Sequence, residues 1–235
     1  MSKSAADVAM VGAAPGIAAT PAINGVGFAS PYWGLAFTLG GGFAAGTIAL
    51  VSQRFGAETF EQLGRAIRSS VVVVIATTIP IGAAFWLFPR ALIGLLTDAP
   101  QTIEYGATYL QVVGLGVPFA ALNLVGSRAL IGADDARVPM LIRGGGAILN
   151  ILLNAIFIFV LGMGVVGAAW GTVVSNILVT GTFAVGLVVG WLPAIGSLPV
   201  TVSARGRYFA WGDIRDIVTI GAPVVGRNMV WTVTR

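Results

Sequence analysis

Two asparagines spaced one helical turn apart are the first residues of this sequence that could do chemistry. Asn150 and Asn154 lie in the apolar stretch GGGAILNILLNAIFIFVLG, and their spacing places both side chains on one face of a helix. A carboxamide that faces lipid has no hydrogen-bond partner, so this face must point toward protein or a wet cavity. The amides either bond one helix to another or offer their carbonyl oxygens to a cation or a polar ligand.

The next apolar stretch, GAAWGTVVSN, carries a second group of polar side chains. Thr172, Ser175 and Asn176 again follow helical spacing. Small and hydroxylated residues at such positions usually mark close packing between membrane helices. We therefore interpret Ser175 and Asn176 as packing residues.

Asp7 differs from the other acidic residues because an apolar stretch follows it directly, in SAADVAMVG. The other acids fall in predicted loops or at predicted helix ends. An ionisable residue inside a membrane helix marks a functional site by default. However, only six residues precede Asp7, so it also fits a solvated residue in a frayed N-terminus. The residues alone leave both interpretations open.

Composition identifies the kind of element that must position these side chains. Hydrophobic residues make up 57% of the chain and charged residues 9%, with a mean hydropathy of +0.92. A soluble domain carries about 25% charged residues, and so few charges could not cover its surface. The 33 glycines show no three-residue period and suit closely packed membrane helices. We predict an all-α, polytopic transmembrane helical bundle.

The residue types that are missing narrow the function. The chain has no cysteine and no histidine, so it lacks thiolate ligands, cysteine nucleophiles and the commonest general base. No P-loop, HExxH or GxSxG motif occurs. The arginines lie near predicted helix ends and not in basic stripes with interleaved aromatics, so nucleic acid is not a predicted partner. We predict no enzyme, no catalytic residue, no cofactor and no dedicated metal site.

Uncharged intervals predict where the chain crosses the membrane, since a spanning helix needs about 20 mostly apolar residues. Residues 8 to about 24 are proline-broken and are predicted to be a helix end and a loop, with too weak a pattern for a signal peptide. Spans are predicted at about 28–53, between Arg68 and Arg90, between Glu104 and Arg128, and twice between Arg143 and Arg205 around a turn at 161–167. A last apolar segment begins near Trp211.

Arginine placement gives this topology an orientation, because cytoplasmic loops are enriched in arginine and lysine. Alternate predicted loops and loop borders hold nine arginines: Arg54, Arg65, Arg68, Arg128, Arg137, Arg143, Arg205, Arg207 and Arg215. The opposite loops hold Arg90. The first set is therefore predicted to face the cytoplasm.

Five stretches, in order along the chain, resemble the multidrug and toxic compound extrusion (MATE) transporters of the polysaccharide-flippase-related superfamily. They are ADVAMVG (6–12), GFASPYWGLAFTLGGGFAAGTIALVSQRFGA (27–57), YLQVVGLGVPFAALNLV (109–125), DDARVPM (134–140) and ILNILLNAIFIFVLGMGVVGAAWGTVVSN (148–176). IGAPVVGRNM (220–229) is similar to the opening of the family's seventh helix.

The resemblance implies a fold and a location. Family members have twelve helices in two six-helix bundles, and they are multi-pass proteins of the plasma membrane. Residues 1–210 would form the N-terminal transmembrane lobe, with a truncated first helix, helices two to six and a cytoplasmic link. Residues 211–235 would begin helix seven, and the C-terminal lobe would be missing from this chain.

The resemblance also implies a function, a cation-coupled antiporter driven by H⁺ or Na⁺ that exports organic, often cationic, drugs or metabolites. Its partners would be these small molecules, the lipid bilayer and the missing lobe. The family's cation site maps onto Asp7, Asn150, Asn154 and Thr172. Some members carry an aspartate where this chain has Asn154, so Asp7 would be the one titratable group of the site. With Na⁺ bound, the amides and the hydroxyl would complete an oxygen shell.

The sequence leaves two alternative functions open. A lipid-linked precursor flippase of the same superfamily would need cationic residues in a central cavity, yet the predicted spans two to six contain no arginine, and Arg227 is the exception in the seventh segment. A half-bundle remnant without transport activity is the other alternative. A membrane enzyme is disfavoured by the absence of histidine and cysteine.

The orientation is directly testable, because the chain contains no cysteine. We expect single cysteines within residues 56–64 and 133–137 to react only from the cytoplasm, and single cysteines within 162–166 only from outside. A membrane-impermeant maleimide applied to intact cells and to opened cells measures both. Labelling of a cysteine at position 134 from outside intact cells would contradict the predicted topology.

Overall fold

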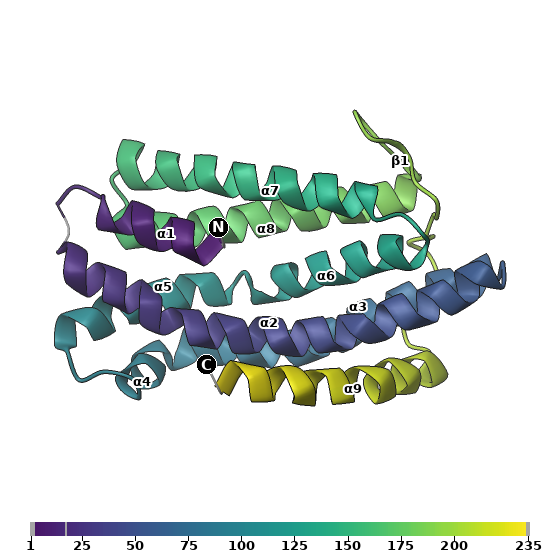
Figure 1. The fold of residues 1–235 in the computed structure, drawn as a ribbon, viewed down its shortest axis with the longest axis horizontal. Coiled ribbons are helices and arrows are strands. Elements are labelled where there is room, and N and C mark those ends of the chain that lie inside the picture. Colours follow the sequence, from purple (N-terminus) through teal and green to yellow (C-terminus); the bar gives the residue numbers. More distant parts are fainter. Residues whose placement is uncertain (1–2, 17, 234–235) are drawn as a thin grey trace. The chain divides into compact units, whose positions relative to one another are not determined.

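The computed structural model describes residues 3–16 and 18–233, and most of them are helical (Figure 1). The elements, in order, are α1 (Lys3–Gly12), α2 (Ala19–Gly56), α3 (Phe60–Leu87), α4 (Pro89–Gly94), α5 (Pro100–Gly114), α6 (Val117–Gly132), α7 (Arg137–Ala155), the π-helix η1 (Ile156–Val160), α8 (Gly164–Val189), β1 (Trp191–Leu192), β2 (Gly196–Ser197) and α9 (Trp211–Val233). The predicted all-α fold class is confirmed.

Several helices are long and apolar enough to cross a membrane. Within the described residues these are α2, α3, α7 continued by η1, and α8. A fifth span results if α5 and α6 are counted together as one interrupted span. The chain breaks between them at Leu115 and Gly116, inside the stretch that the charge pattern predicted as one continuous helix.

The predicted helix boundaries were wrong in two places. Helix α2 begins at Ala19 and not near residue 28, because Pro21 falls in the first turn, where a missing N–H breaks no helical hydrogen bond. The helices also extend past the uncharged intervals. Arg65, Arg68, Arg128 and Arg143 are therefore helical residues of α3, α6 and α7, near the ends of those helices. Long arginine side chains tolerate such positions because the guanidinium can reach toward the interface.

Two predicted turns are confirmed. Gly162 and Gly164 both adopt positive φ, 64° and 54°, in the turn between η1 and α8. Before α7, Asp134 takes a φ of 63° and the Asp135 carboxylate accepts hydrogen bonds from the backbone N–H groups of Arg137 and Val138. Asp135 is therefore the N-cap of α7.

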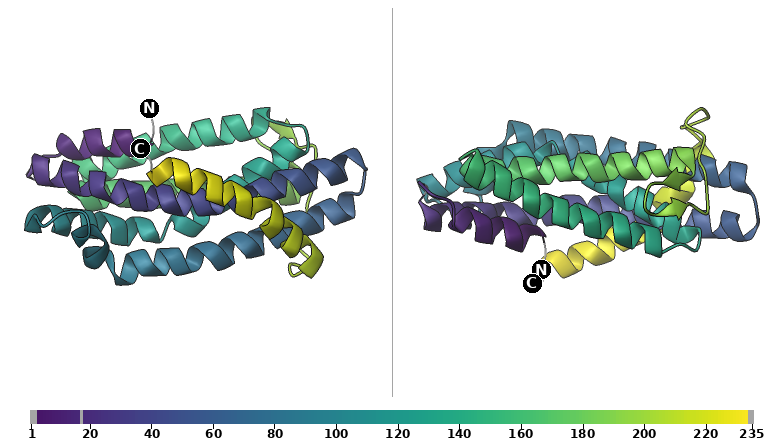
Figure 2. Two further views of the ribbon diagram at one scale, coloured as in Figure 1. Left: turned by 60° about the horizontal axis from the view of Figure 1, so that its bottom comes forward. Right: turned by 90° about the horizontal axis from the view of Figure 1, so that it is seen from above.

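The described residues form two compact units, and each is considered by itself. The first comprises Met1–Ala36, Ile79–Val117 and Gly145–Ile177. Its apolar core takes side chains from α1, α2, α5, α8 and η1, among them Val11, Val26, Leu110, Ile158 and Val165. In this unit α7 and α8 lie side by side (Figures 1 and 2).

The second unit comprises Phe37–Thr78, Pro118–Gly144 and Leu178–Arg235. After α8 the chain forms a short antiparallel hairpin in which Trp191 pairs with Ser197, visible at the end of α8 in Figure 2. The residues beyond the hairpin return to α8, where the Val202 N–H donates to the Leu187 carbonyl at 2.7 Å. Leu192, Leu198 and Val202 are buried there. The sequence pattern did not predict this hairpin.

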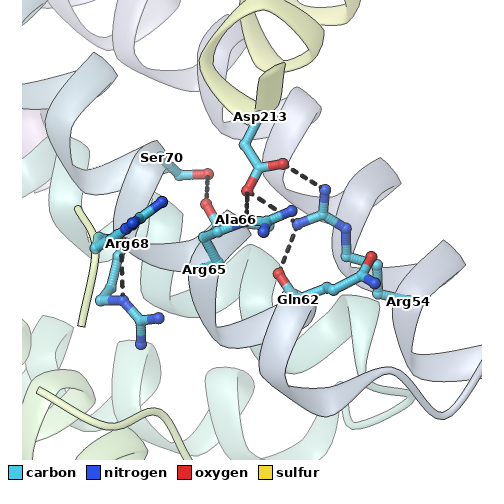
Figure 3. A network of polar contacts seen from close by, with 8 residues as sticks. Arg54, Gln62, Arg65, Ala66, Arg68, Ser70 and Asp213 are labelled. Carbon is cyan, nitrogen blue, oxygen red and sulfur yellow. Dashed lines mark hydrogen bonds and ion pairs between the residues drawn. The ribbon is translucent and has the colours of Figure 1, made fainter. Parts of the chain in front are cut away.

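A buried carboxylate joins three helices of the second unit (Figure 3). Asp213, in the first turn of α9, is 3% exposed and accepts hydrogen bonds from Arg54 at 2.6 Å and from Arg65 at 2.9 Å. Arg54 also donates to the Gln62 carbonyl at 2.6 Å. Burial raises the pKa of Asp213, but the hydrogen bonds and charges of the two arginines outweigh it and hold this pKa below its ordinary value of 3.8. The carboxylate therefore stays ionised and ties α9 to α2 and α3.

Replacing Asp213 by Asn should leave two arginine charges without their partner and lower the free energy of unfolding by about 3 kcal/mol. Because the folded pKa is depressed, the carboxylate contributes its stability above the ordinary value, and this contribution is lost as pH falls through the folded pKa. Wild-type stability should therefore fall more steeply than that of Asp213→Asn below about pH 4. Thermal unfolding in detergent, followed by circular dichroism, measures both effects.

The exposed ion pair of Arg90 and Glu104 provides the matched control. Glu104→Gln removes a carboxylate in the same way but should cost less than about 1 kcal/mol, because solvent screens exposed pairs. Equal destabilisation by the two variants would show that Asp213 does not hold the helices together.

Candidate cation site

Asp7 is buried inside the first unit, with 1% of its surface exposed. It lies on the second turn of α1, and the neighbouring Val11 is fully buried in the apolar core. The interpretation of Asp7 as a solvated residue in a frayed terminus is therefore wrong. A buried carboxylate costs free energy unless polar groups replace the water that it loses.

Side chains from three other helices supply such groups. Asn154 of α7 donates from Nδ2 to Asp7 Oδ1 at 2.6 Å. Tyr109 of α5 and Thr172 of α8 donate their hydroxyl protons to Asp7 Oδ2 at 2.7 and 3.1 Å. The structure thus brings together Asp7, Asn154 and Thr172, three of the residues onto which the resemblance mapped the cation site, and it adds Tyr109.

Asn150, the fourth predicted residue, forms the next layer of the same cluster. Its Nδ2 donates to Thr172 Oγ1 at 3.2 Å and lies 3.5 Å from Asn154 Oδ1. Its own Oδ1 is buried and accepts no hydrogen bond within the described part of the chain. An unsatisfied buried acceptor costs about 1–3 kcal/mol. The cluster therefore contains an oxygen that a ligand could satisfy.

The chemistry of this donor set suits a hard cation. Its potential ligand atoms are carboxylate, amide and hydroxyl oxygens, which Na⁺ and similar ions prefer, and it offers no imidazole or thiolate to a transition metal. Within the described residues no three His, Cys, Asp or Glu side chains form a cluster. To receive Na⁺, the Asn154 amide must turn so that Oδ1 replaces Nδ2 toward Asp7. To receive a proton, Asp7 must become a donor to one of the two hydroxyls.

A close contact between α7 and α8 sets the position of Asn154. A Cβ atom placed on Gly171 would lie 2.0 Å from Asn154 Oδ1 and 3.0 Å from its backbone nitrogen. No side chain fits in that space. Gly171 therefore allows α8 to approach α7 closely enough for Thr172 and Asn154 to share Asp7.

Two further polar residues of α8 follow Thr172 on the same helix. Ser175 is buried and donates to the Thr172 carbonyl at 3.0 Å, as expected of a packing residue. Asn176 is also buried. Tyr109 was missed by the sequence interpretation. The available signal was a tyrosine in an uncharged span, since a buried tyrosine hydroxyl usually finds a polar partner.

Long apolar helices, with a buried polar cluster that joins α1, α5, α7 and α8, are typical of a multi-pass α-helical membrane protein. The MatE family model matches residues 1–156, more than half of the chain, so the chain belongs to this family. The family predicted from the sequence is confirmed, and so is the predicted location as a multi-pass membrane protein.

Individual relatives agree with this assignment. The chain is 31% identical over 131 residues to the probable multidrug resistance protein YpnP of Bacillus subtilis, covering 55% of this chain and 29% of that one. It is 26% identical over 211 residues to the probable multidrug resistance protein NorM of Bradyrhizobium diazoefficiens, covering 86% and 43%. A crystal structure of a MATE protein in complex with MaD3S superimposes with a TM-score of 0.82 at 25% identity, covering 97% of this chain and 49% of that one. The chain thus spans half or less of the length of these relatives.

Gly171→Ala should disrupt the cluster, because the new methyl group must displace Asn154 or separate the two helices. We expect a loss of about 1–3 kcal/mol in the free energy of unfolding, the usual cost of overpacking. Gly181→Ala is the matched control on the same helix, since a Cβ there meets nothing within 4 Å. It should be neutral or stabilising by up to about 1 kcal/mol. Equal melting temperatures for the two variants in detergent would contradict the close contact.

Proposed function

We propose that this chain is one lobe of a cation-coupled antiporter that exports organic, often cationic, compounds. The observation that carries the proposal is the buried Asp7 carboxylate, held by three uncharged donors from three other helices. The relatives named as multidrug resistance proteins support the class of substrate. The predicted boundary at residue 210 and the second lobe belong to this proposal.

A coupling site needs a group that can take up the ion and release it again. Asp7 accepts hydrogen bonds from one amide and two hydroxyls of other helices. Such donors replace part of the water that a buried carboxylate loses. A proton or Na⁺ would bind at this carboxylate, with Asn150, Asn154 and Thr172 as supporting oxygen donors.

The exchange of cation for substrate follows because the binding of each ligand depends on the conformation of the transporter. An ion that binds the cluster more tightly in one state shifts the population toward that state. If substrate prefers the other state, each ligand weakens the binding of the other by the same factor. Downhill entry of the ion can then drive the export of the substrate. Asp7 binds the ion, and Tyr109 orients the carboxylate through its hydroxyl.

Asp7→Asn should abolish cation-driven efflux while leaving membrane insertion intact, because asparagine keeps the shape of the side chain and removes its charge. The assay is ethidium efflux from everted vesicles under an imposed H⁺ or Na⁺ gradient. The transporter tested joins this chain to a C-terminal lobe of its family. Binding of radioactive Na⁺ to the purified chain provides a second readout that does not require transport.

Asp98→Asn is the matched control, since Asp98 is an exposed acid of the same unit. It should leave both efflux and ion binding unchanged. Wild-type efflux in Asp7→Asn would place the coupling site elsewhere in the transporter.

A further inference from the structure

The second unit contains a cavity of about 720 Å³ between the start of α3 and the segment 201–207 that precedes α9. Four arginines line it, Arg65, Arg68, Arg205 and Arg207. Glu61 is the acid on its wall. This volume lies within the range of small-ligand pockets, about 300–1,000 Å³. The cavity shares no residue with the candidate cation site.

Arg68 gives the cavity a buried positive charge. It is 9% exposed, and it donates from Nε to the Arg207 carbonyl at 3.2 Å and from Nη1 to the Ser203 carbonyl at 2.9 Å. The segment 203–207 thus closes around the guanidinium, and Figure 3 shows this side chain pointing away from the Asp213 network. A Cβ on Gly206 would lie 2.8 Å from Arg68 Cζ, so the backbone packs directly against the guanidinium.

This charge lacks a counter-ion within the described residues. Arg68 forms no ion pair there, and its Nη2 group donates no hydrogen bond. Arg205 and Arg207 are exposed and likewise form no ion pair in the described part of the chain. Arg65 is neutralised by Asp213. One glutamate therefore faces three arginines without carboxylate partners, and the cavity favours an anion.

The geometry of the guanidinium groups indicates which kind of anion the cavity binds. Arginine offers a planar fork of N–H donors that matches the oxygens of phosphate. Exposed aromatic side chains surround the same segment. Phe60 lines the cavity, and Phe209 and Trp211, which follow Arg207, are 66% and 70% exposed with their rings stacked. Aromatic residues of this kind gather at the level of lipid headgroups.

We infer that this cavity binds the phosphate group of an anionic phospholipid headgroup. Arg68, Arg205 and Arg207 contact the phosphate, and the aromatic side chains lie among the neighbouring lipids. Basic pockets between membrane helices on the cytoplasmic side are known to select such headgroups. The arginine distribution predicts that this end of the protein faces the cytoplasm. A bound headgroup balances the charge of Arg68 and fixes the segment 203–207 against α3.

Native mass spectrometry of the purified full chain in detergent tests the inference. Dioleoylphosphatidylglycerol and dioleoylphosphatidylcholine are titrated separately, each with and without inorganic phosphate. The variant Arg205→Gln/Arg207→Gln removes two exposed charges without touching the buried Arg68. Because each surface charge changes the affinity for an anionic headgroup about fivefold, the double variant should bind phosphatidylglycerol about 25-fold more weakly. Arg137→Gln/Arg215→Gln changes the net charge equally at exposed sites outside the cavity.

The inference requires three results together. Phosphatidylglycerol binds more tightly than phosphatidylcholine, the cavity variant loses this preference, and the control variant keeps it. Equal loss in both variants would show unspecific attraction between charges and overturn the site. Displacement of phosphatidylglycerol by inorganic phosphate at similar concentration would show a site for soluble phosphate and overturn the assignment to lipid.

Discussion

The burial of the Asp7 carboxylate is the interaction around which the first unit is organised. Helix α1 has ten residues, too few to be stable alone in water. Its position therefore depends on contacts, and these are the apolar packing of Val11 and the polar contacts of Asp7. Since these three donors come from α5, α7 and α8, all three hydrogen bonds form only when the four helices are assembled. Displacement of one of these helices would remove its hydrogen bond to the buried carboxylate.

Among the residues that the structure describes, two acids are buried, and they are held in different ways. Asp213 pairs with two arginines, which remain charged at all relevant pH values, so its own charge is permanently balanced. Such a group stabilises the fold and gains little from binding a further cation. Asp7 accepts hydrogen bonds from two hydroxyls and one amide of other helices. The same side chain is thus a structural link in one unit and a candidate ion site in the other.

The sequence predicted the features that depend on local pattern. Apolar periodicity and uncharged intervals located the spans, and the four-residue spacing of Asn150 and Asn154 placed them on one buried face, as observed. Helix ends were predicted less well, because Pro21 is tolerated in a first turn and arginines such as Arg68 and Arg143 can sit inside a helix near its end. The hairpin after α8 was missed because its apolar residues, such as Leu192 and Leu198, are buried by tertiary contacts with helix ends.

The candidate cation site could be predicted only in part, because some of its contacts depend on the tertiary structure. Asn150 and Asn154 stood out as polar groups in an apolar helix, whereas Thr172 was assigned to the site through the resemblance to MATE transporters. Tyr109 was not, since tyrosine is common in membrane helices and only the tertiary structure places its hydroxyl against Asp7. Likewise, no local signal could distinguish a buried Asp7 from a solvated one beside the chain terminus. The resemblance to MATE transporters predicted that Asp7 lies inside the helical bundle. The packing of α1 against the apolar core accounts for this burial.

The unsatisfied oxygen of Asn150 bears on the choice between helix packing and ligand binding. Membrane helices held together by asparagine gain about 0.6–2 kcal/mol from each hydrogen bond. Asn150 forms bonds through Nδ2, but its buried Oδ1 accepts none in the described part of the chain, which costs free energy of similar size. As packing alone, the residue therefore contributes little more than an apolar side chain would. A cation that bridges Asn150 Oδ1 and the Asp7 carboxylate would recover this cost, and the proposal of a cation site explains why an amide occupies this position.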